Sequence, residues 1–385
     1  MNSIIYTIIM AVLWAINLFN DSGLGQSYQT TEKARSVIFV VFIIIVILSF
    51  RERHFLVDKY DFVVFGGMLL TIVAVSYIKG YGNMGAHYIS VFLLVYILGR
   101  SRVSVLAVKL TGLTYLVLGM SILYIYDYTS VLSGWNGNTI GMIGLYSFLV
   151  FLISFYDVND IKSKIIILVI TGIYINLIGP TDSRSSIWFA IVAVLFALAI
   201  LPRKIITITD KRYYLWLLIP LFIAVFVINV SHGSYMNTLD LWSMRNFQKP
   251  LFNGRDGLWE SGLKILGEHT LFGSGTLEGN WHNCVVTMLI AYGGVGCTFW
   301  LLSLQRILAK GRKWLDDVIV SGCIITFIIM YIQQSVELGL VNENPNLIPY
   351  IVLGIMLGRI KLLDEEVEGI GEHEKNKYYC SNLQC

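Results

Sequence analysis

Long apolar stretches alternate with short polar connections along almost the whole chain. The apolar stretches run about 15 to 22 residues without the alternation of a β-strand, so each fits a membrane-crossing helix. Only helices and closed barrels satisfy every backbone polar group in lipid, and strand patterning is absent here. The pattern predicts an all-α polytopic membrane protein with about 12 transmembrane helices. They lie near residues 3–19, 36–50, 61–78, 88–99, 103–125, 139–156, 165–179, 186–201, 213–230, 283–304, 318–332 and 346–358.

The composition agrees with a membrane protein. Hydrophobic residues make up 56% of the 385 residues and charged residues only 14%, which is far more apolar than an ordinary soluble domain. The net charge of +3 gives no indication of nucleic-acid binding. The 5 cysteines show no paired spacing on a polar loop, so the sequence predicts neither a disulfide framework nor a zinc site.

Basic residues are distributed unevenly between alternate connections. With the N-terminus inside, 20 of the 28 lysines and arginines fall on the inner side, as expected of cytoplasmic loops. The first apolar run, from Ile4 to Phe19, lacks a signal-peptide pattern and is expected to be retained. We therefore expect both termini inside (N-in/C-in) and a single transmembrane domain over residues 1–363. Residues 364–385 are rich in charged residues, and we expect them to form a mobile cytoplasmic tail.

One large extracytoplasmic loop, residues 231–283, separates the ninth and tenth predicted spans, and we expect it to be catalytic. Three polar or glycine-rich motifs lie in this loop, and a fourth lies within the next span. They are Asn253-Gly-Arg-Asp-Gly-Leu-Trp259, Leu271-Phe-Gly-Ser-Gly275, Trp281-His-Asn283 and Tyr292-Gly-Gly-Val-Gly296. The glycines at 273 and 275 are interpreted as turn formers, and those at 293, 294 and 296 as close-packing positions in a helix.

Two outward-facing arginines are candidates for anion binding. Arg255 lies among glycines in the large loop, and Arg184 lies in the tight connection Gly179-Pro-Thr-Asp-Ser-Arg-Ser-Ser186. A planar guanidinium stays charged and suits a diphosphate better than an ammonium does. The alternatives are a solvated loop arginine at 255 and an arginine reaching for lipid headgroups at 184. Arg245, also in the loop, is a candidate substrate-binding residue.

His282 is the candidate general base, because a neutral imidazole accepts a proton near neutral pH. Its alternative role is a helix cap or an interface residue. Glu337, after the eleventh span, is expected either to orient His282 or a sugar hydroxyl, or to be a solvated acid. Asn283 is expected to cap the tenth span, and Asn138 either lines the same cavity or caps the sixth span.

Trp259 and Trp281 are the remaining candidates for substrate binding. They either stack on sugar rings or anchor the loop at the membrane interface, and the interface role is the more common one. No set of residues completes a metal site, so no metal and no cofactor are expected.

These motifs, in this order and with Asp182-Ser-Arg-Ser185 before them, resemble the O-antigen ligase and O-antigen polymerase superfamily of bacterial membrane glycosyltransferases. The motif similarity covers roughly residues 136 to 300. One departure is the short Leu277-Glu-Gly-Asn280 segment before His282, which affects the expected acceptor-binding part of the loop.

The resemblance implies a GT-C-like, metal-independent enzyme of the bacterial cytoplasmic membrane with its active site on the extracytoplasmic face. Its donor would be a polyprenyl (undecaprenyl) diphosphate-linked oligosaccharide, with a flippase and a chain-length regulator as possible partners. Arg184 and Arg255 map onto the family's diphosphate-binding arginines. His282 maps onto the histidine that deprotonates an acceptor hydroxyl, with inversion at the anomeric carbon.

Three functions are compatible with these residues. A polymerase joins lipid-linked repeats into a surface polysaccharide, whereas a ligase transfers a finished glycan to another acceptor. The leaving group and the base are the same in both. A transporter or flippase would place charges and helix breaks in the middle of the membrane, and the predicted spans are nearly free of charge there. We favour the polymerase.

Overall fold

The computed structural model describes residues 2–21, 58–79, 84–128, 135–156, 160–202, 205, 213–233, 235–275, 281–337, 339–341 and 345–382. Its regular elements over these residues are all helices, which confirms the all-α class. The predicted span 36–50 falls outside the described residues. Each of the other predicted spans coincides with a helix or a helix pair.

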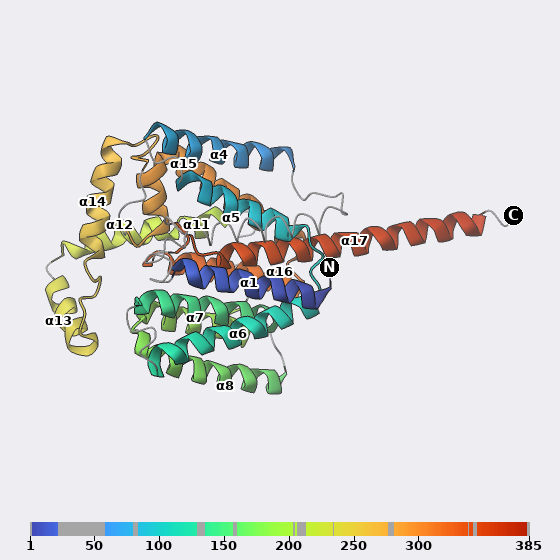
Figure 1. Cartoon of the computed structure of the whole chain (residues 1–385), viewed down its shortest axis with the longest axis horizontal. Helices are drawn as coiled ribbons and strands as arrows, with labels where there is room; N and C mark the ends of the chain where they lie inside the picture. The colour runs from blue at the N-terminus through green and yellow to red at the C-terminus, as the bar shows by residue number, and fades with distance from the viewer. Residues whose placement is uncertain are drawn as a thin grey trace.

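Most helices run side by side in one bundle (Figure 1). Its members are α1 (Ser3–Asp21), α4 (Lys59–Ile78), α5 (Met84–Gly99), α6 (Val105–Tyr128), α7 (Gly137–Leu152), α8 (Ile161–Ile178), α9 (Arg184–Ala197), α11 (Tyr213–Leu217), α12 (Ile219–Ser231), α15 (Cys284–Lys310), α16 (Val318–Gln333) and α17 (Ile348–Asn382). Single turns of 3-10 helix follow α7, α8 and α15: η2 (Ile153–Phe155), η3 (Gly179–Thr181) and η5 (Gly311–Trp314).

Five of the described helices are long and apolar enough to cross a membrane, and the bent pair of α12 with the helix after it would be a sixth. Three shorter apolar helices lie at Ser3–Leu18, Arg184–Ala197 and Val318–Gln333. These helices support a membrane-embedded protein, and the number of twelve spans stays a prediction.

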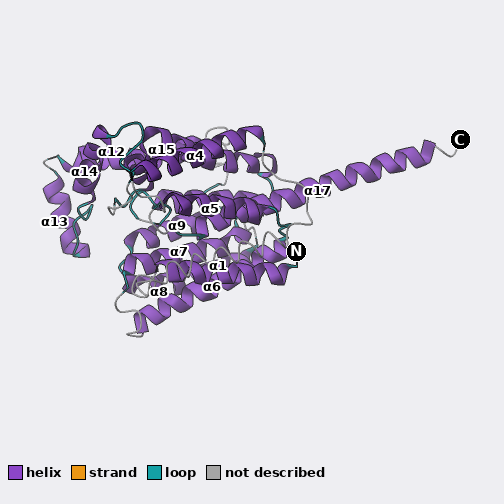
Figure 2. Cartoon of the chain, turned by 45° about the horizontal axis from the view of Figure 1, so that its top comes forward, coloured by secondary structure: helices purple, strands orange, loops and turns teal. Residues whose placement is uncertain are grey.

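The two ends of the bundle differ. Two helices of the large loop, α13 (Met236–Phe247) and α14 (Arg255–Glu268), lie at one end, whereas α1 begins and α17 ends at the other (Figures 1 and 2). Residues 364–382, expected to form a mobile tail, continue α17 as helix. Both ends of the described chain thus lie opposite the large loop. Which end faces the cytoplasm stays a prediction.

Ion pairs fix α15 at the end of the bundle that is far from the loop. The Asp61 carboxylate of α4 is fully buried, accepts from Arg306 Nε at 2.9 Å and pairs with Lys310. Arg359 of α17 pairs with Asp317 at 2.8 Å, just before α16. These contacts hold α15 and α16 in register with α4 and α17, and the loop ends of α15 and α16 carry the site described below.

α15 is broken at Gly293, where φ is 66° and ψ is −172°. The predicted single span 283–304 is therefore two helical segments. The break leaves two carbonyls and two amides of α15 without helical partners. The turn 270–275 satisfies them: Ser274 and Gly275 donate to Ile290 and Ala291 at 2.8 Å each, while Gly294 and Val295 donate to Thr270 and Leu271 at 2.8 and 3.1 Å.

The glycines of this turn adopt the conformation that the sequence predicts. Gly273 and Gly275 have φ values of 71° and 80°, a region that L side chains rarely adopt, so their interpretation as turn formers is confirmed. The predicted span 213–230 is likewise two helices, α11 and α12, and Pro220 lies in the first turn of the second.

Candidate active site at the loop end of the bundle

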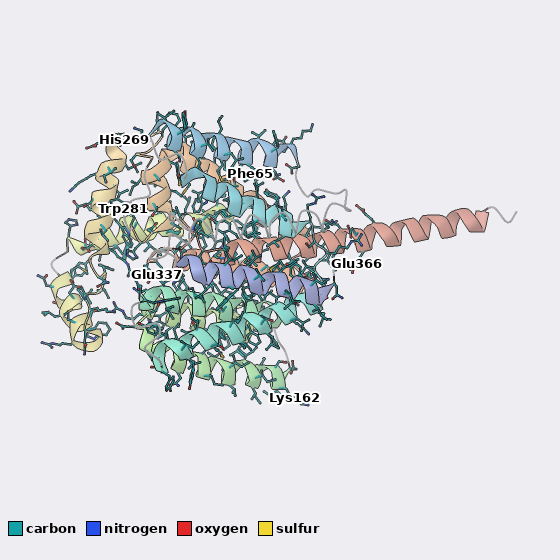
Figure 3. All side chains as sticks on the ribbon, viewed as in Figure 1. Phe65, Lys162, His269, Trp281, Glu337 and Glu366 are labelled. Carbon is teal, nitrogen blue, oxygen red and sulfur yellow. The ribbon has the colours of Figure 1, made fainter. Side chains whose placement is uncertain are left out.

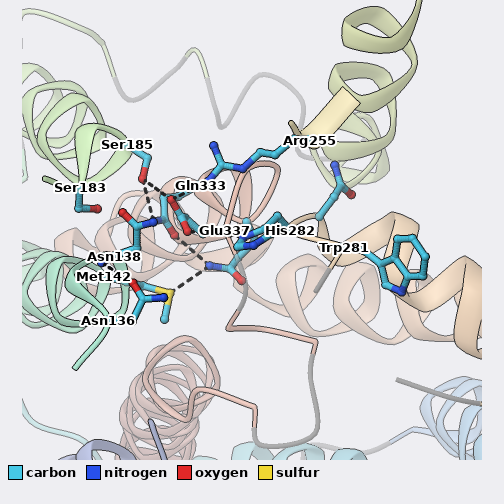
Figure 4. Close-up of polar contacts among 12 residues, drawn as sticks. Asn136, Asn138, Met142, Ser183, Ser185, Arg255, Trp281, His282, Gln333 and Glu337 are labelled. Carbon is cyan, nitrogen blue, oxygen red and sulfur yellow. Dashed lines mark hydrogen bonds and ion pairs between the residues drawn. The ribbon is translucent and has the colours of Figure 1, made fainter. Parts of the chain in front are cut away.

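Glu337 lies at the centre of a polar cluster at the loop end of the bundle (Figures 3 and 4). Its Oε1 is 3.3 Å from Nη2 of Arg255 and accepts from Ser185 Oγ at 3.1 Å. Its Oε2 is 3.9 Å from Nδ1 of His282. The carboxylate is only 7% exposed. Three segments far apart in the sequence therefore meet at one buried acid.

Both candidate arginines occupy the first position of a helix. Arg184 begins α9 and Arg255 begins α14. A cation at this position is mildly destabilised by the positive end of the helix dipole, and a nearby negative charge offsets this effect. The cap residues Ser183 and Gly254 supply no side-chain acceptor to the first turn. Two uncapped helix starts with arginines at their first positions are suited to binding a phosphate group.

The charges of the two arginines act on each other. Burial lowers the pKa of Arg255, the Glu337 carboxylate raises it, and the positive charge of Arg184 lowers it further. Burial also raises the pKa of Glu337, and Arg255 opposes this shift. The effect of Arg184 on the pKa of Arg255 indicates that the two side chains lie near each other, and their convergence on one diphosphate stays a prediction. An incoming anion would relieve the repulsion between them.

His282 sits immediately before α15, in a left-handed backbone conformation with φ 47°. Its Nδ1 is buried and has no hydrogen-bond partner among the described residues, although the side chain as a whole is 27% exposed. Burial, followed by the charge of Arg255, lowers its pKa from 6.5 to about 4. The imidazole is therefore neutral at pH 7 and able to accept a proton.

Asn283 holds this segment in place. Its Oδ1 accepts from the amides of Val285 and Val286 at 3.1 Å each, so the predicted cap of α15 is confirmed. Its Nδ2 donates to the carbonyls of Pro220 and Ser335 at 2.7 and 3.2 Å. Asn283 is fully buried, and these bonds account for its polar atoms. It fixes His282 relative to α12 and to the turn that carries Glu337.

Trp259 and Trp281 are packed inside the loop. Trp259 is 1% exposed and Trp281 9%, and Nε1 of Trp259 donates to the carbonyl of Trp281. They form a small core with Val286 and Ile290 of α15. This burial corrects the expectation that they are interface anchors or open platforms for sugar rings. They join α14, and thus Arg255, to the segment that carries His282.

Two other predicted residues lie at the edge of the cluster or away from it. Asn138 is half-buried in the first turn of α7, and Figure 4 shows it on the side where Ser183 and Met142 lie. The cap of α7 is Asn136, whose side chain accepts from the Asn138 amide at 2.9 Å, so the capping role predicted for Asn138 is wrong. Arg245 is exposed on α13. None of the hydrogen bonds and ion pairs described for the cluster involves Arg245.

Sequence reasoning missed Ser185 and Gln333 as individual site residues. Gln333 Nε2 lies 3.5 Å from Ser185 Oγ, and its Oε1 accepts from the Tyr146 hydroxyl at 3.0 Å. Gln334 adds bonds to Tyr146 and Gln333 at 2.6 and 2.9 Å. A chain of hydrogen bonds thus runs from Glu337 into the bundle (Figure 4). The sequence signal for Gln333 was that two glutamines, Gln333 and Gln334, end an apolar span, where buried side-chain amides require hydrogen-bond partners.

Lys249 was also missed. It pairs with Asp182, two residues before Arg184, and it follows Gln248, where the chain reverses in a left-handed conformation after α13. Nothing in the residue pattern favours Lys249 over Arg245 in the same loop.

No family model matches the chain, and a search of curated proteins finds no match. A function for this chain is therefore inferred from the geometry of the cluster and from the motifs that compose it.

The cluster combines fixed positive charge with a neutral base. Arg255, at the start of α14, contacts Glu337, and Arg184 begins α9 with a charge that acts on Arg255. His282 faces the other oxygen of the same acid. Among the described residues, no group of three or more His, Cys, Asp or Glu side chains is placed to hold a metal ion. The described residues can bind a diphosphate and remove a proton within one site.

Proposed function

We propose that this chain is a glycosyltransferase of the bacterial cytoplasmic membrane that polymerises lipid-linked oligosaccharide repeats. The donor is a polyprenyl-diphosphate-linked glycan, and the active site faces the extracytoplasmic side. The observation that carries the proposal is the position of Glu337, with Arg255 on one carboxylate oxygen and His282 facing the other.

The two arginines bind and neutralise the diphosphate of the donor. As the bond between the anomeric carbon and the diphosphate oxygen breaks, the electron pair leaves with the diphosphate, and fixed guanidinium charges stabilise it. They do so without a metal ion. The hydrophobic part of the lipid stays in the bilayer, which accounts for a membrane-embedded enzyme.

His282 removes the proton from an acceptor sugar hydroxyl, whose oxygen attacks the anomeric carbon from the opposite face. Glu337 accepts a hydrogen bond from Nδ1, which leaves the lone pair of Nε2 for the acceptor proton. The 3.9 Å separation shortens to hydrogen-bond distance on substrate binding, as catalytic contacts commonly do. One displacement gives inversion of the anomeric configuration.

A ligase is the second candidate, because it uses the same leaving group and the same base. It differs only in its acceptor. Polymerisation is preferred because the sequence contains no segment recognisable as a surface for a second class of acceptor. A transporter would share the helix breaks at Gly293 and between α11 and α12. It is less compatible with the cluster, because the unusual polar residues gather at one end of the bundle.

The test is transfer by the purified protein in liposomes, with a defined undecaprenyl-diphosphate-linked repeat and EDTA present throughout. A polymerase gives a ladder of products that differ by one repeat. Transfer only to an added, different acceptor identifies a ligase. Movement of the intact lipid-linked repeat across the bilayer, without new glycosidic bonds, identifies a flippase. Product formation that requires a divalent cation contradicts the metal-independent scheme.

A further inference from the structure

Lys249 connects the large loop to the turn that holds Arg184. Its ammonium pairs with the Asp182 carboxylate. Asp182 follows η3 in a left-handed conformation with φ 58° and stands two residues before Arg184. Ser185, the next residue, donates to Glu337. The Lys249 ammonium therefore lies at the rim of the cluster that contains both candidate arginines.

The charges of this cluster are not balanced. Arg184, Arg255 and Lys249 carry positive charge, whereas Glu337 and Asp182 are its carboxylates and His282 is neutral. Glu337 supplies a single negative charge near the arginines, whereas a diphosphate carries more than one. Among these named groups, three cations thus face two carboxylates, and a bound diphosphate would add negative charge beside them.

The pair between Lys249 and Asp182 is easily exchanged. The lysine is 37% exposed and the aspartate 58%. Exposed ion pairs contribute little net stability, because water and salt compete for both partners. A lysine side chain is also long and flexible, so its ammonium can turn to a new partner without movement of the backbone.

We propose that Lys249 is a third ligand of the diphosphate. Until the anion enters, Asp182 holds the Lys249 side chain at the rim of the site. On binding, the ammonium leaves the aspartate and contacts a diphosphate oxygen. This inference rests on the proposed function for the identity of the anion, but it concerns binding and not glycosyl transfer.

The test is the affinity of the purified protein for inorganic diphosphate in EDTA, measured by calorimetry. Lys249→Met is expected to weaken binding about tenfold, the loss of one charge-assisted contact. Lys249→Arg, which keeps the charge, is expected to retain most of the affinity. Lys264→Met is the matched control: Lys264 is in the same loop, 74% exposed and paired with Glu260 one helical turn away. It should bind diphosphate as the unaltered protein does.

Asp182→Asn separates this role from a structural one. If Asp182 only holds Lys249 in reserve, its loss frees the ammonium and tightens diphosphate binding, and this gain disappears in the Lys249→Met background. If the pair is merely a clamp between two loops, Asp182→Asn and Lys249→Met weaken binding alike. That result overturns the inference.

Failure of this inference is distinguishable from failure of the proposed function. A product ladder together with equal diphosphate affinities for Lys249→Met and Lys264→Met overturns the role of Lys249 alone. Lys249-dependent diphosphate binding without glycosyl transfer overturns the enzyme and leaves the anion site. A protein that does not bind diphosphate at all overturns both.

Discussion

A Cβ atom at Gly293 would lie 2.3 Å from the carbonyl carbon of Leu271. The backbone of the turn 270–275 fills the break in α15 and replaces its missing hydrogen bonds. The turn follows α14, which begins with Arg255, and the broken helix begins just after His282. The contact between Leu271 and Gly293 therefore helps to set the distance between the start of α14 and His282.

Replacement of Gly293 by alanine should destabilise the protein and inactivate it. Its backbone conformation is accessible almost only to glycine and costs another residue about 1 to 3 kcal/mol, and the new methyl group would collide with the Leu271 backbone. The midpoint of thermal unfolding in detergent should fall, with a loss of transfer at temperatures where the protein is still folded.

Gly294→Ala is the control for this substitution. The nearest atom to a Cβ at Gly294 is 3.5 Å away, an ordinary contact, and the residue is helical. Its thermal midpoint should stay close to that of the unaltered protein. Equal stabilities for the two alanine variants would contradict a structural role of the Leu271 contact.

Glu337→Gln should separate binding from catalysis. Glutamine keeps the shape of the side chain but cannot orient the imidazole as a carboxylate does, so the rate of transfer should fall about tenfold or more. The same change removes a negative charge that competes with the donor for Arg255, so diphosphate affinity should be unchanged or higher. Single-turnover rates and diphosphate titration measure the two effects. Weaker binding with an unchanged rate would mean that Glu337 does not position His282.

The pH dependence of transfer should report the environment of His282. Burial and Arg255 lower its pKa from 6.5 to about 4, so the proton-accepting form persists in mildly acidic solution. The value of kcat/KM, which reflects the unliganded enzyme, should fall only as the pH drops toward about 4. A bound diphosphate offsets the charge of Arg255, so the acid limb of kcat should lie at a higher pH. If kcat/KM instead began to fall at pH 6.5 or above, the His282 imidazole would be in contact with water and its pKa would not be lowered by burial.

Apolar length was a good guide to the helices, because a run long enough to cross a membrane must satisfy its backbone polar groups as a helix. It was a poor guide to their interruptions. The break at Gly293 depends on hydrogen bonds from the turn 270–275, and local pattern does not reveal which distant backbone can supply them. A glycine in an apolar run is equally consistent with close packing.

For the candidate site, the sequence indicated segments better than individual contacts. The residue pattern predicts Arg255, His282 and Glu337 because each lies in a connection expected to face outward and carries chemistry of its own. The rotation of α9 about its axis determines that Ser185 contacts Glu337. The reversal of the chain after α13 determines that Lys249, and not Arg245, reaches Asp182. The burial of Trp259 and Trp281 follows from the packing of α14 on α15, which spacing alone does not specify.

Arg255→Lys tests whether the site needs a guanidinium or only a positive charge. Arg255 is 15% exposed and contacts Glu337 through one terminal nitrogen, so the rest of its planar group is available to a diphosphate. A lysine ammonium is a compact charge that cannot contact the carboxylate and two phosphate oxygens in one plane. Diphosphate affinity and product yield should both fall at least tenfold. Arg245→Lys, made on the exposed face of α13 in the same loop, should leave both unchanged. Equal effects of the two substitutions would mean that the large loop attracts the donor by net charge, and the specific anion site at the start of α14 would have to be abandoned.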